Sequence, residues 1–158
     1  MNRFGWGLVA LALAVGGQVL SVYVPAVAAF FDFFLVMTVY YAVTTRQVSA
    51  MLVGAGCGLV QDALLGSIVG LNAFAKALLG YAIAALGNRV LLHQTPARLL
   101  VLAVASVLQA FILFALQHVL GEPAELPAVS HLLGAALGNA VLGAVAYRVV
   151  RPRRERVR

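Results

Sequence analysis

Three ionisable side chains interrupt long apolar stretches of the sequence: Asp32, Asp62 and Lys76. A charged side chain at membrane depth costs about 2.5–3.5 kcal/mol, so such residues are candidates for binding, proton transfer or pairing. Left apart, the three would cost on the order of 8–10 kcal/mol in total. We therefore expect Lys76 to pair with Asp62, with Asp32 or with both, in an intramembrane polar cluster that also includes Asn72.

The sequence leaves three interpretations of this cluster open. The first is an ion pair that only fixes helix packing, the second is a ligand or proton site, and the third is snorkelling of Asp62 or Lys76 to the nearby interface. Uncharged amides add interhelical hydrogen bonds worth about 0.6–2 kcal/mol each. The amides available for this are Gln18, Gln61, Asn72, Gln109, Gln117 and Asn139.

Residue types that are typical of catalytic or metal centres are too scattered to form one. The histidines, at positions 93, 118 and 131, lack a metal-ligand spacing such as H-E-x-x-H. The single cysteine, Cys57, excludes an intramolecular disulfide. Neither a G-x-S-x-G motif nor a phosphate-binding P-loop occurs in the sequence. We expect no catalytic residue, no metal and no cofactor, and therefore no enzyme activity.

The composition indicates that lipid is the solvent of these polar residues. Of the 158 residues, 63% are hydrophobic and 10% are charged, against roughly 45–50% and about 25% in soluble domains. A membrane-crossing helix needs about 20 apolar residues, and six such segments are visible, at 5–22, 26–44, 48–65, 71–92, 98–119 and 128–148. We predict an all-α polytopic membrane protein, with a bundle of about six transmembrane helices in residues 1–150 and a basic cytoplasmic tail in residues 151–158.

The arginines predict the orientation of this bundle. They flank every second connection, at Arg3, Arg46, Arg89 and Arg98 and from Arg148 onward, whereas the intervening connections carry no Lys or Arg. Cytoplasmic loops carry the excess of Lys and Arg, so we expect both termini in the cytoplasm. The net charge of +6 therefore indicates topology rather than nucleic-acid binding. The first segment imitates a cleavable signal peptide, but its loss would break the alternation, so we expect it to be retained.

Small residues and arginines mark candidate contact surfaces. G-x-x-x-G spacing lets helix backbones approach closely, and it occurs at Gly54 and Gly58 and again at Gly134 and Gly138. Each pair could contact a helix of the same bundle or the helix of a partner. The arginines at the C-terminal end could bind an anionic leaflet or an acidic partner; they are Arg148, Arg151, Arg153, Arg154, Arg156 and Arg158.

A family resemblance rests on the stretch GLVQDALLGSIVGLNAFAKALLGY, residues 58–81. This stretch resembles the signature region of the bacterial rod shape-determining protein MreD family. The matching residues are Gly58, Gln61, Asp62, Gly66, Gly70, Leu71, Asn72 and Tyr81. The resemblance implies a non-enzymatic subunit of the cell-elongation machinery in the cytoplasmic membrane. It also implies a fold similar to the substrate-binding subunits of energy-coupling-factor transporters.

The resemblance further implies protein partners. Members of the family associate with the single-span protein MreC, and the complex works with RodA, a class B penicillin-binding transpeptidase and MreB filaments on the cytoplasmic side. We therefore expect a scaffold that binds the helix of an MreC-like partner on one of the two glycine faces. The alternative is a transporter subunit for a vitamin-type small molecule, with Asp32, Asp62, Asn72 and Lys76 lining its pocket.

Overall fold

The computed structural model describes residues 12, 14–19, 23, 30–87 and 95–150. These residues are helical or lie in connections, and no strand occurs among them. After a helical stretch at 14–19 come five helices: α3 (Phe33–Ala42), α4 (Gln47–Leu65), α5 (Leu71–Gly87), α6 (Thr95–Val119) and α7 (Val129–Val150). The all-helical fold class is confirmed for this part of the chain. Most of the first expected segment, 5–22, lies outside it.

The four later helices follow the expected segments closely. α4 and α7 begin and end within two residues of the expected segments 48–65 and 128–148. α5 begins where expected, at Leu71. α6 begins three residues earlier than expected, at Thr95, because Pro96 is well suited to the first turn of a helix. α4, α6 and α7 each contain a window long and apolar enough to cross a membrane.

The outer surface of the helices is apolar. Leu52 on α4, Leu100 on α6 and Leu137 on α7 are each more than 60% exposed. Large apolar patches of this kind are rare on soluble monomers. They fit a protein whose outer surface is covered by lipid.

The second expected segment, 26–44, is wrong in its extent. Phe31 and Asp32 are not helical, and α3 has 10 residues. Asp32 has an extended backbone, and its Oδ1 accepts a hydrogen bond from Leu35 N at 2.8 Å, which caps the helix. At 1.5 Å per residue, α3 rises about 15 Å, half of the roughly 30 Å of hydrocarbon in a bilayer. The start of α3 therefore lies near the middle of the bundle.

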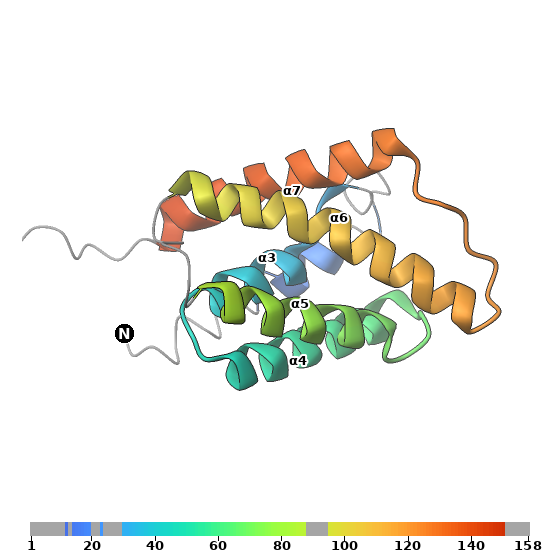
Figure 1. The fold of residues 1–158 in the computed structure, drawn as a ribbon. Coiled ribbons are helices and arrows are strands. Elements are labelled where there is room, and N and C mark those ends of the chain that lie inside the picture. The colour runs from blue at the N-terminus through green and yellow to red at the C-terminus, as the bar shows by residue number, and fades with distance from the viewer. Residues whose placement is uncertain (1–11, 13, 20–22, 24–29, 88–94, 151–158) are drawn as a thin grey trace, which may run out of the picture.

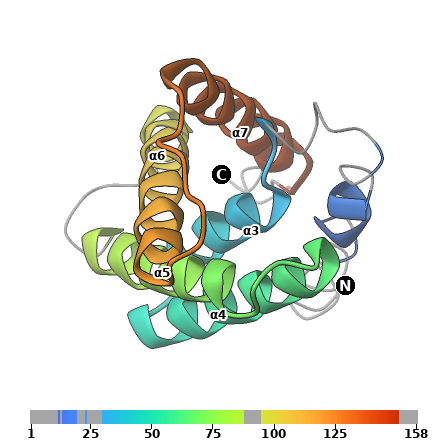
Figure 2. The same ribbon diagram turned by 90° about the vertical axis from the view of Figure 1, so that its right-hand side faces the viewer.

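α3 lies between two helix pairs, as Figures 1 and 2 show. α4 pairs with α5, and α6 pairs with α7. Both pairs are antiparallel. In the first, Gly54 lies against Lys76 while Gly80 lies against Ala50. In the second, Asn139 bonds to Ser106 while Gly143 lies against Leu102. The connections 66–70 and 120–128 therefore share one end of the bundle, and Figure 1 shows both on the same side. Arg46 and Arg98 lie at the other end.

The hydrophobic core surrounds α3. Leu35 and Val39 of α3 pack with Leu79 of α5 and Leu102 of α6 in one cluster. On another side, Phe34 packs with Ala14 and Cys57. α3 contacts each of α4, α5, α6 and α7. The position of Asp32, which caps its first turn, therefore determines which polar groups meet inside the bundle.

Candidate functional site

A polar network surrounds the first turn of α3, near the middle of the bundle. Its centre is the ion pair between Lys76 Nζ and Asp32 Oδ2, which are 2.8 Å apart. The Lys76 side chain is fully buried, and the Asp32 side chain is 14% exposed. The structure therefore pairs Lys76 with Asp32, one of the two partners that the sequence left open.

Gln109 of α6 closes a triangle with the ion pair. Its Oε1 accepts a hydrogen bond from Lys76 Nζ at 3.0 Å, and its Nε2 donates to Asp32 Oδ2 at 2.6 Å. An amide suits this position because it offers an acceptor to the ammonium and a donor to the carboxylate at the same time. The triangle connects α3, α5 and α6.

Asn139 extends the network to α7. Its Oδ1 accepts a hydrogen bond from the backbone N–H of Asp32 at 2.7 Å, and its Nδ2 donates to Ser106 Oγ at 2.9 Å. Ser106 in turn donates to the carbonyl of Leu102 at 2.8 Å. At the break before α3, the backbone N–H of Asp32 is thus bonded by α7, and the Asp32 carboxylate is bonded by side chains of α5 and α6. Irregular backbone inside a membrane needs such partners within the protein.

The described hydrogen bonds of this network run among its own members. The two charges neutralise each other, and both amides use their donor and acceptor atoms on other members of the network. A ligand would have to break these bonds before it could bind. Among the described residues, no group of three or more His, Cys, Asp or Glu side chains could hold a metal ion.

Asp62 and Asn72 lie in a second cluster, at the turn between α4 and α5. The Asp62 carboxylate accepts hydrogen bonds from Asn72 Nδ2 and Gly70 N at 2.8 Å and from Ser67 Oγ at 3.0 Å. It also accepts from the backbone N–H groups of Asn72 and Ala73, at 3.2 and 3.4 Å. Asp62 thereby caps the start of α5 from the end of α4.

The residues of the stretch 58–81 build this hairpin. Gly66 ends α4 with a left-handed backbone, and Gly70 also has a positive φ, which glycine adopts without a steric penalty. Gly58 lies directly against the backbone of Ala73. Five of the eight residues that carry the family resemblance therefore have a structural explanation, a close turn held by one buried carboxylate: Gly58, Asp62, Gly66, Gly70 and Asn72.

The structure divides the expected four-residue cluster into two parts. Asp32 and Lys76 meet near the middle of the bundle, whereas Asp62 and Asn72 meet at its loop end. The sequence identified Gln109 and Asn139 only as general hydrogen-bonding residues, and it missed Ser106. The one signal for Ser106 is its position three residues before Gln109, on the same face of α6.

Both glycine faces are filled from within the chain. Gly54 and Gly58 lie against the backbone of α5, at Lys76 and Ala73. Gly134 lies against the ring of Phe30, and Gly138 lies against its carbonyl. In this structure the four glycines therefore contact residues of the same chain.

The close approach at Gly58 gives a matched pair of substitutions. A Cβ at Gly58 would overlap the Ala73 backbone, so Gly58→Ala should cost about 1–3 kcal/mol. Gly56, on the same helix, has no neighbouring atom within 4 Å of its added Cβ, so Gly56→Ala should be neutral or stabilising, because alanine is the better helix former by about 1 kcal/mol. Thermal unfolding of the two purified variants in detergent checks the prediction. Equal stability of the two variants would contradict the close contact.

The tail arginines lie largely outside the described residues. Arg148 belongs to the last turns of α7, but its side chain is not described, and Arg151, Arg153, Arg154, Arg156 and Arg158 lie in the range 151–158. Their binding to lipid or to an acidic partner stays a prediction.

The comparisons with known proteins gave one result. The family model described as rod shape-determining protein MreD matches residues 2–144. No curated protein and no solved structure matches the chain.

Proposed function

The chain belongs to the MreD family of rod shape-determining proteins, and we propose that it is a non-enzymatic scaffold of the machinery that elongates bacterial cells and builds their peptidoglycan. Family membership indicates a role in the determination of rod shape. Its long apolar helices agree with a membrane protein. The finer role, a scaffold that holds other proteins, is our proposal.

The observation that carries the scaffold proposal is the use of polar groups inside the bundle. Lys76, Asp32 and Gln109 bond to one another, and Asn139 bonds to the break before α3. These bonds connect four helices at one depth. Polar groups that bond to one another across these helices suit a protein that presents its outer surface to partners.

We also propose six crossings with both termini in the cytoplasm of a bacterium, in its inner membrane. Arg46 and Arg98 lie at one end of the bundle, and the exposed Glu122 and Glu125 lie in the connection at the other end. Lys and Arg mark the cytoplasmic side. The arginine end therefore faces the cytoplasm in this proposal.

The proposed partner is an MreC-like protein with a single transmembrane helix. RodA and a class B penicillin-binding transpeptidase join the assembly, and MreB filaments lie on the cytoplasmic side near the basic tail. Because the two glycine faces are filled by Ala73, Lys76 and Phe30, the partner helix contacts the lipid-facing surface.

Photo-crosslinking tests this direct contact. A photoreactive residue replaces, one at a time, an exposed leucine on each of four helices: Leu52, Leu78, Leu108 and Leu137. The chain is co-expressed with the MreC-like protein of the same organism, and an unrelated single-span protein at the same level serves as the control.

A crosslink to the MreC-like protein from one position or from two neighbouring helices, with none to the control protein, is the expected result. It would also identify the contact face. Crosslinks to neither protein from all four positions, or equal crosslinks to both, would count against direct helix contact.

One observation favours a second candidate, a transporter subunit for a small molecule. Helices that break near the middle of the membrane often hold substrate in transporters, and α3 begins there. The bonds within the network oppose this function because they leave no polar atom of the Lys76–Asp32–Gln109 triangle without a partner. A vitamin that raises the unfolding temperature of the purified chain would support the transporter, and its effect should disappear in the Gln109→Leu variant.

A further inference from the structure

The turn between α4 and α5, residues 66–70, has an apolar surface. Residues 63–69 include no charged residue, and their exposed members are Ala63, Leu64, Leu65, Gly66, Ile68 and Val69. Val69 is 72% exposed, and Ile68 beside it is 44% exposed. Connections in water carry mainly polar side chains, so the surface of this turn indicates an apolar environment.

The polar groups of the turn are directed to Asp62 instead of outward. Ser67 Oγ and Gly70 N donate hydrogen bonds to the Asp62 carboxylate, at 3.0 and 2.8 Å. Ser67 N donates to the carbonyl of Asp62 at 3.2 Å. Within the part of the chain that the structure describes, no hydrogen bond uses the backbone N–H groups of Ile68 and Val69. These two groups need a partner outside the chain, which the head-group layer of a membrane supplies and its hydrocarbon does not.

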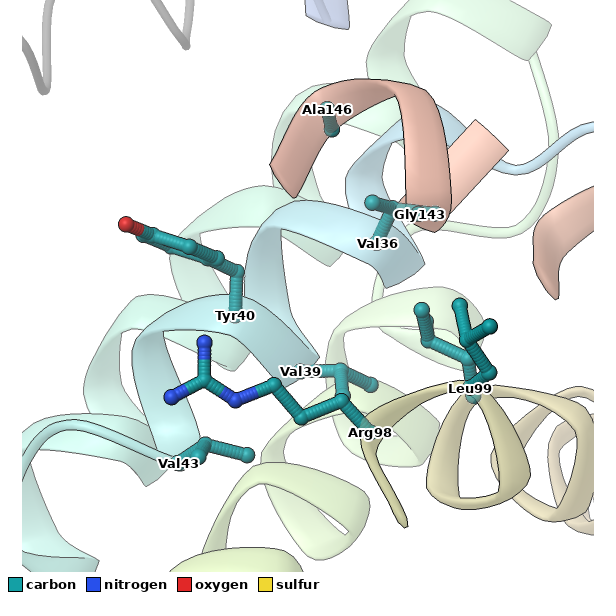
Figure 3. Close-up of a pocket in the computed structure, with 9 residues that line it drawn as sticks. Val36, Val39, Tyr40, Val43, Arg98, Leu99, Gly143 and Ala146 are labelled. Carbon is teal, nitrogen blue, oxygen red and sulfur yellow. The ribbon is translucent and has the colours of Figure 1, made fainter. Parts of the chain in front are cut away.

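The arginine end of the bundle marks one boundary of the membrane. Arg46 directly precedes α4, and Arg98 lies in the first turn of α6. Figure 3 shows Arg98 near Tyr40, which lies in the last turn of α3. Arginine and tyrosine are typical of the layer between hydrocarbon and water, so the length of each helix can be measured from this end.

The length of α4 places the α4–α5 turn at the opposite boundary. From Arg46 to Leu65, α4 rises about 28 Å. The hydrocarbon is about 30 Å thick, and any tilt of the helix shortens its rise across the membrane. The residues that follow Leu65 therefore begin at the edge of the hydrocarbon and not in water.

The connection between α6 and α7, at the same end, differs from this turn. From Arg98 to Val119, α6 rises about 32 Å, which is enough to leave the hydrocarbon. The connection 120–128 then extends beyond the α4–α5 turn, as Figure 1 shows. It exposes Glu122 and Glu125, as a connection in water should.

From these observations we propose that the α4–α5 turn is inserted in the surface of the bilayer opposite the arginine end. The side chains of Leu65, Ile68 and Val69 lie among the upper parts of the acyl chains, and the free N–H groups lie at the head groups. Interfacial segments bury their apolar side chains about 5–10 Å into this boundary. The inference requires only that the bundle crosses a membrane, and it does not depend on the proposed scaffold function.

Lipid is the occupant that the neighbouring surfaces support. Leu64 on α4 and Phe74 on α5 are exposed on either side of the turn, so the apolar surface of the turn continues into the lipid-facing surface of both helices. The hydrogen bonds of Asp62 then have a second role besides holding the hairpin. They satisfy polar groups that would otherwise favour a position of the turn in water.

Electron paramagnetic resonance of a nitroxide spin label tests the proposal on the full chain in liposomes. Val69→Cys and Ile68→Cys each place the label on the turn. The matched controls are Glu125→Cys, at an exposed position in the other connection, and Leu78→Cys, on the exposed face of α5. Because Cys57 is buried, the unchanged chain treated with the same reagent measures any labelling at that residue. Collisions of each label are measured with oxygen, which concentrates in hydrocarbon, and with a neutral nickel chelate, which stays in water.

The labels on the turn should collide with oxygen as the label of Leu78→Cys does. They should collide severalfold less with the nickel chelate than the label of Glu125→Cys. Nickel collisions equal to those of Glu125→Cys would overturn the proposal, because the turn would then lie in water. Protection from both reagents would also overturn it, because protein and not lipid would then cover the turn. If Val69→Cys does not insert into the membrane, Ile68→Cys decides the question.

Discussion

Replacing Lys76 with methionine should destabilise the bundle by about 3–5 kcal/mol, because it leaves the Asp32 carboxylate among buried groups without its counter-charge. Lys76 is fully buried, and its ammonium bonds to both Asp32 and Gln109. The loss should lower the unfolding temperature by on the order of 10 °C. Heating in the presence of a thiol-reactive dye measures it, since the only cysteine, Cys57, is buried until the bundle opens.

Two double substitutions identify the partner of Lys76. Lys76→Met with Asp32→Asn should regain most of the loss, because both charges are removed and asparagine still caps α3. Lys76→Met with Asp62→Asn should be no better than the single change, because Asp62 bonds to the hairpin turn instead. The reverse order of stability would show that the carboxylate paired with Lys76 is Asp62.

Replacing Asp62 with alanine should cost about 2–4 kcal/mol, through the loss of the cap on α5 and of the acceptor for several buried donors. Asp62 is fully buried, and it accepts hydrogen bonds from Ser67, Gly70, Asn72 and Ala73. Cys57 lies on α4, five residues before Asp62. The same dye assay on Cys57 therefore reports opening of this hairpin.

The matched controls for Asp62 separate its hydrogen bonds from its charge. Asp62→Asn keeps one acceptor oxygen and should cost less than alanine, whereas Glu125→Gln, at an exposed position in the other loop of the same end, should change nothing measurable. An Asp62→Ala variant as stable as Glu125→Gln would contradict the capping role.

Most of the helices could be predicted from the apolar segments and from the polar, proline and glycine residues between them, because membrane helices must be long and apolar. α4 is bounded by Arg46 and Gly66, and α7 begins two residues after Pro127. Each of these signals is local in the sequence. The expected similarity to energy-coupling-factor subunits concerns tertiary arrangement, and with no matching solved structure it stays a prediction.

The break before α3 escaped prediction because the residues around it are apolar and read as one continuous helix. The local signal was Asp32 itself, whose short carboxylate competes for the backbone N–H of Leu35. Whether an aspartate in an apolar run caps a helix or only faces the bundle depends on neighbours from other helices. Here Asn139, distant in sequence, bonds the backbone N–H that the break exposes.

The division of the polar cluster also depends on tertiary structure. In sequence, Lys76 is closer to Asp62 than to Asp32. The hairpin turn positions Asp62 over the start of α5, where Asn72 and Gly70 use its oxygens, while α3 brings Asp32 beside Lys76 one turn further along α5. Spacing along the chain cannot distinguish these two arrangements, because it contains no information on how α3 lies between the helix pairs.

The shape of cells during depletion of this protein, in the bacterium that encodes it, tests the central claim most directly. As the protein disappears, the ratio of cell length to width should fall until the cells are round. A plasmid copy of the unchanged chain should restore rods, and so should the Lys76→Met, Asp32→Asn double variant. Cells that keep their rod shape after complete depletion would contradict a role of this protein in shape determination.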